Sequence, residues 1–303
     1  MNGYGNLIYK TAHTKYGPVR YLDMGASNNK VVLFSTGGGA SFMGAIAFEW
    51  ICDAGYRVLS INRPGYYDLP VNAASSIEEQ ADIYHEVIKS LNIEDKINVF
   101  GISMGGLSAL YYTSKYPTKS LVLWSAVTGK YQVNKESANS LLGRLVLKKS
   151  GKKLISWMLK TSAKLFPEMT IETFLKTEAD LNKKERQKIA REIVQDPESK
   201  AEFMAFIASM TPMNDLYKGM MDEVNKVENL GEVDWTIITC PTYAIHSTID
   251  IDVGMDHPKR LEEMIPNLKL EYVKAGGHFV WWGTEGKAVK KNTIQFLNEI
   301  NMD

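Results

Sequence analysis

Apolar and polar positions alternate in two rhythms over the first 126 residues of the chain. Short, mainly apolar runs predict buried strands; they lie at residues 31–34, 57–61, 97–100 and 120–124. An opening antiparallel pair is predicted at Asn6–Lys10 and Val19–Leu22, joined by a turn at Tyr16-Gly17-Pro18. Three- and four-residue apolar spacing predicts helices at about 42–54, 77–91 and 104–116. Strands that alternate with helices favour an α/β protein with a mostly parallel, doubly wound sheet.

The alternation stops after Ala126, and residues 128–233 carry amphipathic, lysine-rich patterns without a convincing strand. These patterns predict helices around Leu141-Leu142 and Leu145, around 154–159, and at 203–213. The strand rhythm is expected to resume at 235–238 and 242–246, followed by a helix at 259–264, a strand at 268–273 and a helix at 286–300. We therefore predict a core of residues 1–127 and 235–303, with an all-helical lid of residues 128–234 inserted after the sixth strand.

The segment Gly101-Ile102-Ser103-Met104-Gly105 lies between a predicted strand and a predicted helix. A serine with a glycine two residues away on each side fits a tight strand-to-helix turn, which lifts the hydroxyl clear of the sheet. Side chains at the glycine positions would crowd that turn. Ser103 is therefore the candidate nucleophile.

A serine hydroxyl needs a base, and the base needs an orienting partner. His278 follows the last predicted strand and two glycines, so it is the candidate base; a solvated or core position is favoured for the other histidines, which are His13, His85, His246 and His257. Asp250 and Asp252 follow the strand that ends at His246. Asp250 is the preferred orienting acid because it falls where the strand has just ended, and Asp252 is the alternative.

Acyl transfer also needs donors for the developing oxyanion, and a run of three glycines at 37–39 follows the third predicted strand. Backbone amides of glycines can approach a substrate closely. The predicted donors are the amides of Gly38 and Met104. The alternative explanation is a tight turn that requires positive φ.

Together these segments resemble the α/β-hydrolase fold, in its lid-bearing, esterase and aminopeptidase-like branch. Gly101–Gly105 matches the nucleophile elbow of that family, and Gly277-His278-Phe279 matches its histidine loop; further similar segments are 36–39, 62–66 and 247–253. The resemblance implies an eight-stranded, mostly parallel sheet. Three positions depart from the family pattern, where Thr36 replaces a histidine, Asn62 an aspartate and Ser247 a glycine. The Thr36 departure weakens any direct link to prolyl aminopeptidases.

Composition narrows the possible partners. The chain has 303 residues with 35 basic and 35 acidic side chains, so its net charge of zero predicts no general attraction to nucleic acid or to an anionic membrane. Cys52 and Cys240 lie in apolar contexts that favour reduced thiols. No run approaches the roughly 20 apolar residues of a membrane span, and no signal peptide is evident. The expectation is a soluble, cytoplasmic protein of unknown oligomeric state that needs no cofactor or metal.

Methionine and aromatic side chains of the predicted insertion are candidates for lining the substrate pocket. Methionines and aromatics form either an adaptable apolar wall for an acyl group or ordinary packing; they are Phe203, Met204, Phe206, Met210, Met213, Tyr217, Met220 and Met221. The lysine-rich run 148–153 is interpreted as a solvated helix end or turn, with a membrane or partner contact as the alternative.

The chain is thus expected to be a serine carboxylesterase or related acyl hydrolase, with a small-molecule acyl substrate. The alternatives are an aminopeptidase or C–C bond hydrolase that uses the same residues, or a non-catalytic sensor that retains them. Acidic lid residues near Ser103 would favour an amine-bearing substrate, and the candidates are Glu168, Glu172 and Asp180.

Overall fold

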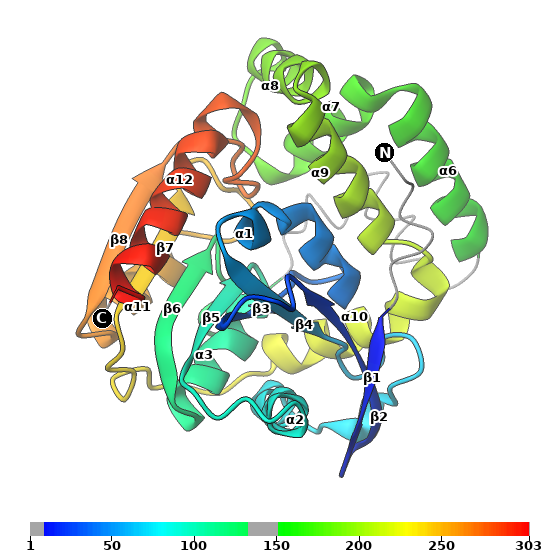
Figure 1. Cartoon of the computed structure of the whole chain (residues 1–303). Coiled ribbons are helices and arrows are strands. Elements are labelled where there is room, and N and C mark those ends of the chain that lie inside the picture. The colour runs from blue at the N-terminus through cyan, green and yellow to red at the C-terminus, as the bar shows by residue number, and fades with distance from the viewer. Residues whose placement is uncertain (1–8, 133–150, 303) are drawn as a thin grey trace.

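The computed structural model describes residues 9–132 and 151–302 of the chain, and a single sheet of eight strands forms its centre (Figure 1). The strands are β1 (Lys10–Thr14), β2 (Gly17–Met24), β3 (Lys30–Ser35), β4 (Tyr56–Ile61), β5 (Ile97–Ile102), β6 (Thr118–Trp124), β7 (Thr242–Ser247) and β8 (Leu268–Val273). Their order is β1-β2-β4-β3-β5-β6-β7-β8, with β1 and β2 antiparallel and the others parallel. The predicted mostly parallel, eight-stranded sheet is confirmed.

Helices cover both faces of the sheet, because alternate strand residues point to opposite sides. One apolar cluster joins Leu33 to α2 (Ile77–Ser90), α3 (Gly105–Lys115) and α11 (Asp256–Met264). The other joins Phe34 to η2 (Phe42–Phe48), α1 (Trp50–Asp53) and α12 (Gly283–Ile300). A short 3₁₀ turn, η3 (Val71–Ala73), precedes α2.

The start of α2 illustrates how the sequence specifies these helices. Ser76 caps the helix, since its Oγ accepts a hydrogen bond from the Glu79 amide at 3.0 Å. The Glu79 carboxylate accepts hydrogen bonds from the amide and the hydroxyl of Ser75. Ile77 and Ala81, one turn apart, are both buried against the sheet.

Five described helices lie between β6 and β7, so the predicted helical insertion is confirmed. They are α6 (Lys152–Leu165), α7 (Pro167–Glu178), α8 (Lys183–Gln195), α9 (Pro197–Ser209) and α10 (Met213–Glu228). The Ser41 amide beside η2 donates to the Ser209 carbonyl of α9 at 2.9 Å, and the Gly219 amide of α10 donates to the Gly65 carbonyl at 3.0 Å. The expected helix around Leu141, Leu142 and Leu145 lies outside the described residues.

Two expected strands differ from the described structure. β1 is Lys10–Thr14 and does not end at Lys10, because β1 and β2 pair directly up to the turn, with Thr14 opposite Gly17; residues 6–8 of the expected strand Asn6–Lys10 lie outside the described residues. Trp235–Ile238 is a turn rather than a strand, and the Ile238 amide donates to the Trp235 carbonyl at 3.0 Å. Trp235 and Ile238 are buried while Ile237 is 65% exposed, so residues two apart, 235 and 237, do not share a face as they would in a strand.

None of the helices within residues 9–132 and 151–302 is both long enough and apolar enough to cross a bilayer.

Candidate active site

Ser103 lies in a strained turn directly after β5. Its φ is +51°, and its amide donates to the Trp124 carbonyl of β6 at 3.0 Å. A Cβ on Gly105 would lie 2.3 Å from the Ser35 carbonyl oxygen, and one on Gly101 would lie 2.7 Å from the Ala109 Cβ. Both flanking glycines are therefore sterically required. Strain of this kind, held by neighbouring strands, is typical of a reactive group that is fixed at a sheet edge.

The glycine run after β3 packs directly against this turn. A Cβ on Gly37 would lie 3.2 Å from the Ser103 Cβ, and one on Gly38 would lie 3.4 Å from the Met104 Cβ. Among the described residues, neither the Gly38 amide nor the Met104 amide donates a hydrogen bond, whereas the Gly39 amide donates to the Tyr66 hydroxyl at 3.1 Å. Gly38 and Met104 thus remain the candidate oxyanion donors.

A buried arginine, which the sequence analysis did not single out, holds the glycine run in place. Arg63 donates three hydrogen bonds of 2.7–3.1 Å to backbone carbonyls, which belong to Thr36, Gly37 and Ala40. Its guanidinium also pairs with Glu223 of α10 at 3.1 Å, and Glu223 accepts from the Tyr66 hydroxyl at 2.7 Å. Burial opposes the charge on Arg63, but the Glu223 carboxylate more than compensates and raises its pKa. The insertion therefore supports the glycine run through one buried ion pair.

His278 and Asp250 form a buried pair after β8 and β7. Nδ1 of His278 lies 2.9 Å from Oδ2 of Asp250, whose other oxygen accepts the Asp252 and Val253 amides at 2.9 Å each. Burial acts to raise the pKa of Asp250, but the charge and hydrogen bond of His278 lower it overall. An ionised Asp250 accepts the Nδ1 proton, which leaves Nε2 of the neutral imidazole as an acceptor. Of the two predicted carboxylates, Asp250 is the one at Nδ1.

Two further carboxylates lie near the imidazole. Oδ2 of Asp252 is 3.8 Å from Nε2, and Glu178, at the end of α7, has a carboxylate oxygen within 4.8 Å of a ring nitrogen of His278 and of a carboxylate oxygen of Asp252. Burial disfavours a charged His278, but Asp250, Asp252 and Glu178 outweigh it and raise its pKa to about 10. Burial, with the charge of Asp252, raises the pKa of Glu178 to about 8. No hydrogen bond joins Ser103 to His278 among the described residues.

The end of α7 is hydrogen-bonded both to the loop that carries Asp250 and to the loop that carries His278. The His278 amide donates to the Glu178 carbonyl at 2.9 Å, and the Asp180 amide donates to the Ile249 carbonyl at 2.9 Å. Gly277 has a φ of +66°, and a Cβ there would meet the Ala179 Cβ at 2.2 Å. The insertion can therefore approach this closely only because residue 277 is a glycine.

The same groups also form a possible cation site. Glu178, Asp252 and His278 offer one imidazole and two carboxylates within 4.8 Å of one another, a donor set that suits several divalent metals. A cation on Nε2 would occupy the lone pair that a serine mechanism requires. Metal binding and general-base catalysis are therefore alternatives for this imidazole.

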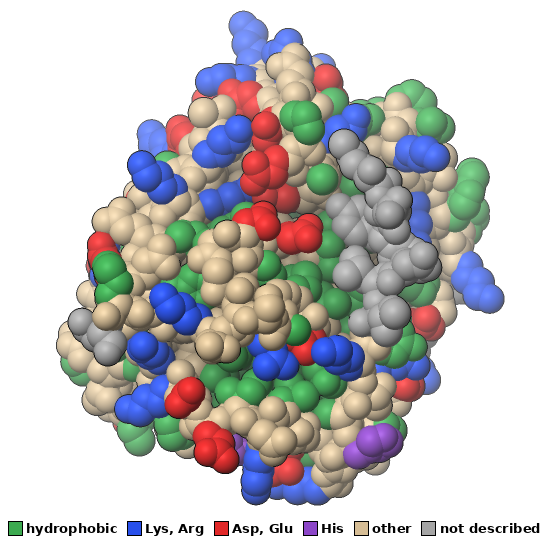
Figure 2. All heavy atoms as spheres, viewed as in Figure 1, with side chains coloured by type: hydrophobic (Ala, Val, Ile, Leu, Met, Phe, Trp, Pro, Cys, Tyr) green, Lys and Arg blue, Asp and Glu red, His purple; other side chains and the backbone are tan. Residues whose placement is uncertain are grey.

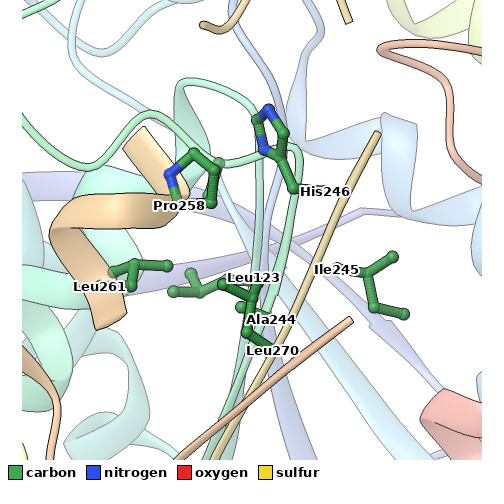
Figure 3. A pocket seen from close by; sticks show the side chains of 8 residues that line it. Leu123, Ala244, Ile245, His246, Pro258, Leu261 and Leu270 are labelled. Carbon is green, nitrogen blue, oxygen red and sulfur yellow. The ribbon is translucent and has the colours of Figure 1, made fainter. Parts of the chain in front are cut away.

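Three of the other four histidines have local packing explanations, and His13 is exposed on β1. His246 is buried, with Nε2 3.0 Å from the Val253 carbonyl oxygen; Nδ1 of His257 accepts from the Thr128 amide at 3.0 Å; and His85 stacks on Tyr116. A small cavity between β7 and α11 is lined by His246 and otherwise by apolar side chains (Figure 3). This apolar lining indicates a packing gap and not a reaction site.

A strained serine turn at the carboxyl end of a mostly parallel sheet, with a histidine loop after the last strand, is the arrangement of α/β hydrolases. The model of the alpha/beta hydrolase fold family matches residues 30–284, and the chain belongs to that family.

Two proteins of similar sequence are named as hydrolases. An uncharacterized hydrolase of Bacillus subtilis is 22% identical over 88% of this chain and 90% of its own length. A 2-hydroxy-6-oxononadienedioate/2-hydroxy-6-oxononatrienedioate hydrolase of Cupriavidus pinatubonensis is 28% identical over 91% of this chain and 89% of its own length. These named relatives support a hydrolytic enzyme.

Two solved structures share the fold. An alpha/beta hydrolase fold protein from Nakamurella multipartita has a TM-score of 0.85 at 21% identity, and it covers 96% of this chain and 99% of its own. An esterase from Exiguobacterium antarcticum has a TM-score of 0.64 at 16% identity, with 96% and 100% covered.

Proposed function

We propose that the protein is a serine hydrolase that cleaves a carboxylic ester through Ser103, His278 and Asp250. The observation that carries the proposal is the buried pair of His278 and Asp250, whose Nδ1 and Oδ2 atoms are 2.9 Å apart. This pair lies at the same edge of the sheet as the strained Ser103. A serine, a base and an orienting acid in this chain order are the parts of an acyl-transfer centre.

In the proposed reaction, Nε2 of His278 removes the proton from Ser103 Oγ as the oxygen attacks the ester carbonyl. The amides of Gly38 and Met104 stabilise the oxyanion. The imidazolium, stabilised by Asp250, then protonates the leaving alcohol, and an acyl-enzyme forms. His278 next takes a proton from water, the hydroxyl attacks the acyl carbon, and the acid leaves as the proton returns to Ser103. The Oγ–Nε2 hydrogen bond must form when substrate binds. No cofactor takes part.

The helices α6–α10 serve in this proposal as a lid over the acyl group. Met220 of α10 supports that role, since its Sδ is 3.3 Å from the Cβ position of Gly39. An apolar, flexible side chain above the glycine run is suited to an alkyl or aryl substituent.

Charge in the site favours an uncharged acyl group. At the alkaline pH at which His278 is a neutral base, Glu178, whose pKa is raised to about 8, is ionised and lies close to Asp252 and the imidazole, and like charges close together in a buried site repel. An acyl chain that ends in a carboxylate is therefore disfavoured, which separates this chain from the Cupriavidus pinatubonensis relative, whose name gives dioates as its substrates. C–C bond cleavage of such compounds is not the function that the site favours.

An amine-bearing acyl substrate is the second candidate, and Glu178 is the observation that favours it. Glu178 comes from the insertion and lies beside the imidazole, whereas Glu168 and Asp180 are exposed on the surface. A substrate ammonium between Glu178 and Asp252 would offset two of the carboxylates that charge His278. Faster hydrolysis of an aminoacyl ester than of its deaminated analogue would favour this candidate over the uncharged ester.

The pH dependence of a Glu178→Gln variant tests the proposed role of His278. His278 acts as a base only when neutral, and its raised pKa, to about 10, places the rise of kcat/KM in the alkaline range. Loss of the Glu178 charge lowers the pKa of His278, so the rise should move roughly one pH unit towards acid. The measurement is kcat/KM for a p-nitrophenyl ester across pH, corrected for spontaneous hydrolysis.

Glu168→Gln, at an exposed position of the same helix, is the matched control and should leave the profile unchanged. A midpoint that is identical in wild type and Glu178→Gln would refute the assignment of His278 as the titrating base.

A further inference from the structure

Large exposed apolar side chains are concentrated on one part of the insertion. Of ten such side chains in the described residues, six lie between residues 154 and 169, each between 48% and 63% exposed. They are Leu154, Trp157, Met158, Leu165, Phe166 and Met169. Isolated exposed apolar residues are ordinary, whereas a contiguous group marks an interaction site.

The spacing of apolar residues along α6 places the exposed ones on a different side of the helix from the buried ones. At about 100° per residue, Leu154, Trp157 and Leu165 fall on one stripe. Ile155 and Leu159 fall on the opposite side, where both are buried. The stripe is therefore additional to the apolar side that the helix needs for its own packing.

A row of lysines runs along the edge of the stripe. Lys153, Lys160 and Lys164 are exposed and lie seven and four residues apart, on one side of the helix. Residues 151–166 contain four lysines and no acidic residue, in a chain whose net charge is zero. In Figure 2, hydrophobic and basic side chains lie together along the right-hand edge, where Figure 1 places α6. We call these three lysines and the six apolar side chains the α6 face.

We propose that the α6 face docks on the surface of an anionic phospholipid bilayer. Tryptophan, leucine and phenylalanine on a helix rimmed by lysines enter the boundary between headgroups and acyl chains, while the lysines reach the phosphates. A second copy of the chain fits less well, since a two-fold contact through this face would bring two lysine rows together. Docking would hold the insertion, and the site beneath it, at a lipid surface.

The test is binding of the full chain to vesicles of phosphatidylcholine, alone or mixed equally with phosphatidylglycerol, at about 0.1 M salt. We expect binding at least about tenfold tighter to the anionic vesicles, with a blue shift of tryptophan emission that Trp157→Phe removes. The triple variant Lys153→Glu, Lys160→Glu and Lys164→Glu should lose at least about tenfold in affinity. A Trp157→Ser, Phe166→Ser variant should also bind weakly, because the inserted apolar area is gone.

The matched control reverses three exposed lysines of α8, Lys183, Lys184 and Lys188, and should bind like the wild type. Equal affinity for both vesicles, no binding to either, or equal weakening by both triple variants would overturn the proposal. So would a dimer, measured by sedimentation, that Trp157→Ser abolishes. Binding is measured without turnover, so this result is independent of whether Ser103 is the nucleophile.

Discussion

A Ser103→Ala variant is expected to hydrolyse a short p-nitrophenyl ester about a million-fold more slowly than the wild type. The reason is specific to the proposed chemistry, because without Oγ no acyl-enzyme can form. Alanine keeps the Cβ, so the turn, with a φ of +51° at this residue, meets no new steric conflict. Thermal unfolding should therefore be nearly unchanged while steady-state turnover falls to the background rate.

Ser114→Ala is the matched control for this experiment. Ser114 lies on α3, the helix that follows the turn, and its hydroxyl donates to the Tyr111 carbonyl at 2.9 Å. This variant should retain wild-type turnover. Ester hydrolysis that persists in Ser103→Ala at the wild-type rate would exclude Ser103 as the nucleophile.

An Asp250→Asn variant is expected to lose about 10⁴-fold in kcat. The amide can still accept the Asp252 and Val253 amides, which now bind Oδ1, so the loop keeps its shape. Its NH₂ group would face Nδ1 of His278, however, and would stabilise the tautomer that carries its proton on Nε2. That tautomer cannot take a proton from Ser103. The measurement is kcat at a fixed alkaline pH, with circular dichroism to verify the fold.

Asp252→Asn is the matched comparison two residues away. Asp252 accepts from the Tyr131 hydroxyl at 2.6 Å and lies 3.8 Å from Nε2, so it does not hold Nδ1. We expect its kcat to change by less than about tenfold at that pH. A larger loss in Asp252→Asn than in Asp250→Asn would reverse the assignment of the orienting acid.

The sheet and its turns were predictable from the sequence because each depends on local information. Glycines at 101 and 105 predict the turn at Ser103, and the structure shows the backbone contacts that require them. The position of Asp250 directly after a strand likewise indicated which carboxylate the histidine would meet.

The side chains of the insertion that contact the candidate site were not predictable from the sequence. Glu178 and Glu223 come from helices whose approach to the sheet depends on tertiary packing, as at Gly277 against Ala179 and Gly219 against Tyr66. Neighbouring acids, Glu172 and Asp180, carry the same sequence signal as Glu178. The prediction of a strand at Trp235–Ile238 is wrong for a related reason. This segment buries apolar side chains from a turn, and the apolar pattern alone does not distinguish such a turn from a strand.

The proposed function requires Ser103 to be an activated nucleophile. Incubation of the full chain with a fluorophosphonate probe, followed by mass spectrometry of the modified peptide, tests it most directly. We expect one phosphonylated residue, Ser103, with labelling abolished in Ser103→Ala and greatly slowed in Asp250→Asn. An unlabelled wild-type protein, or a label on another residue that persists in Ser103→Ala, would contradict it.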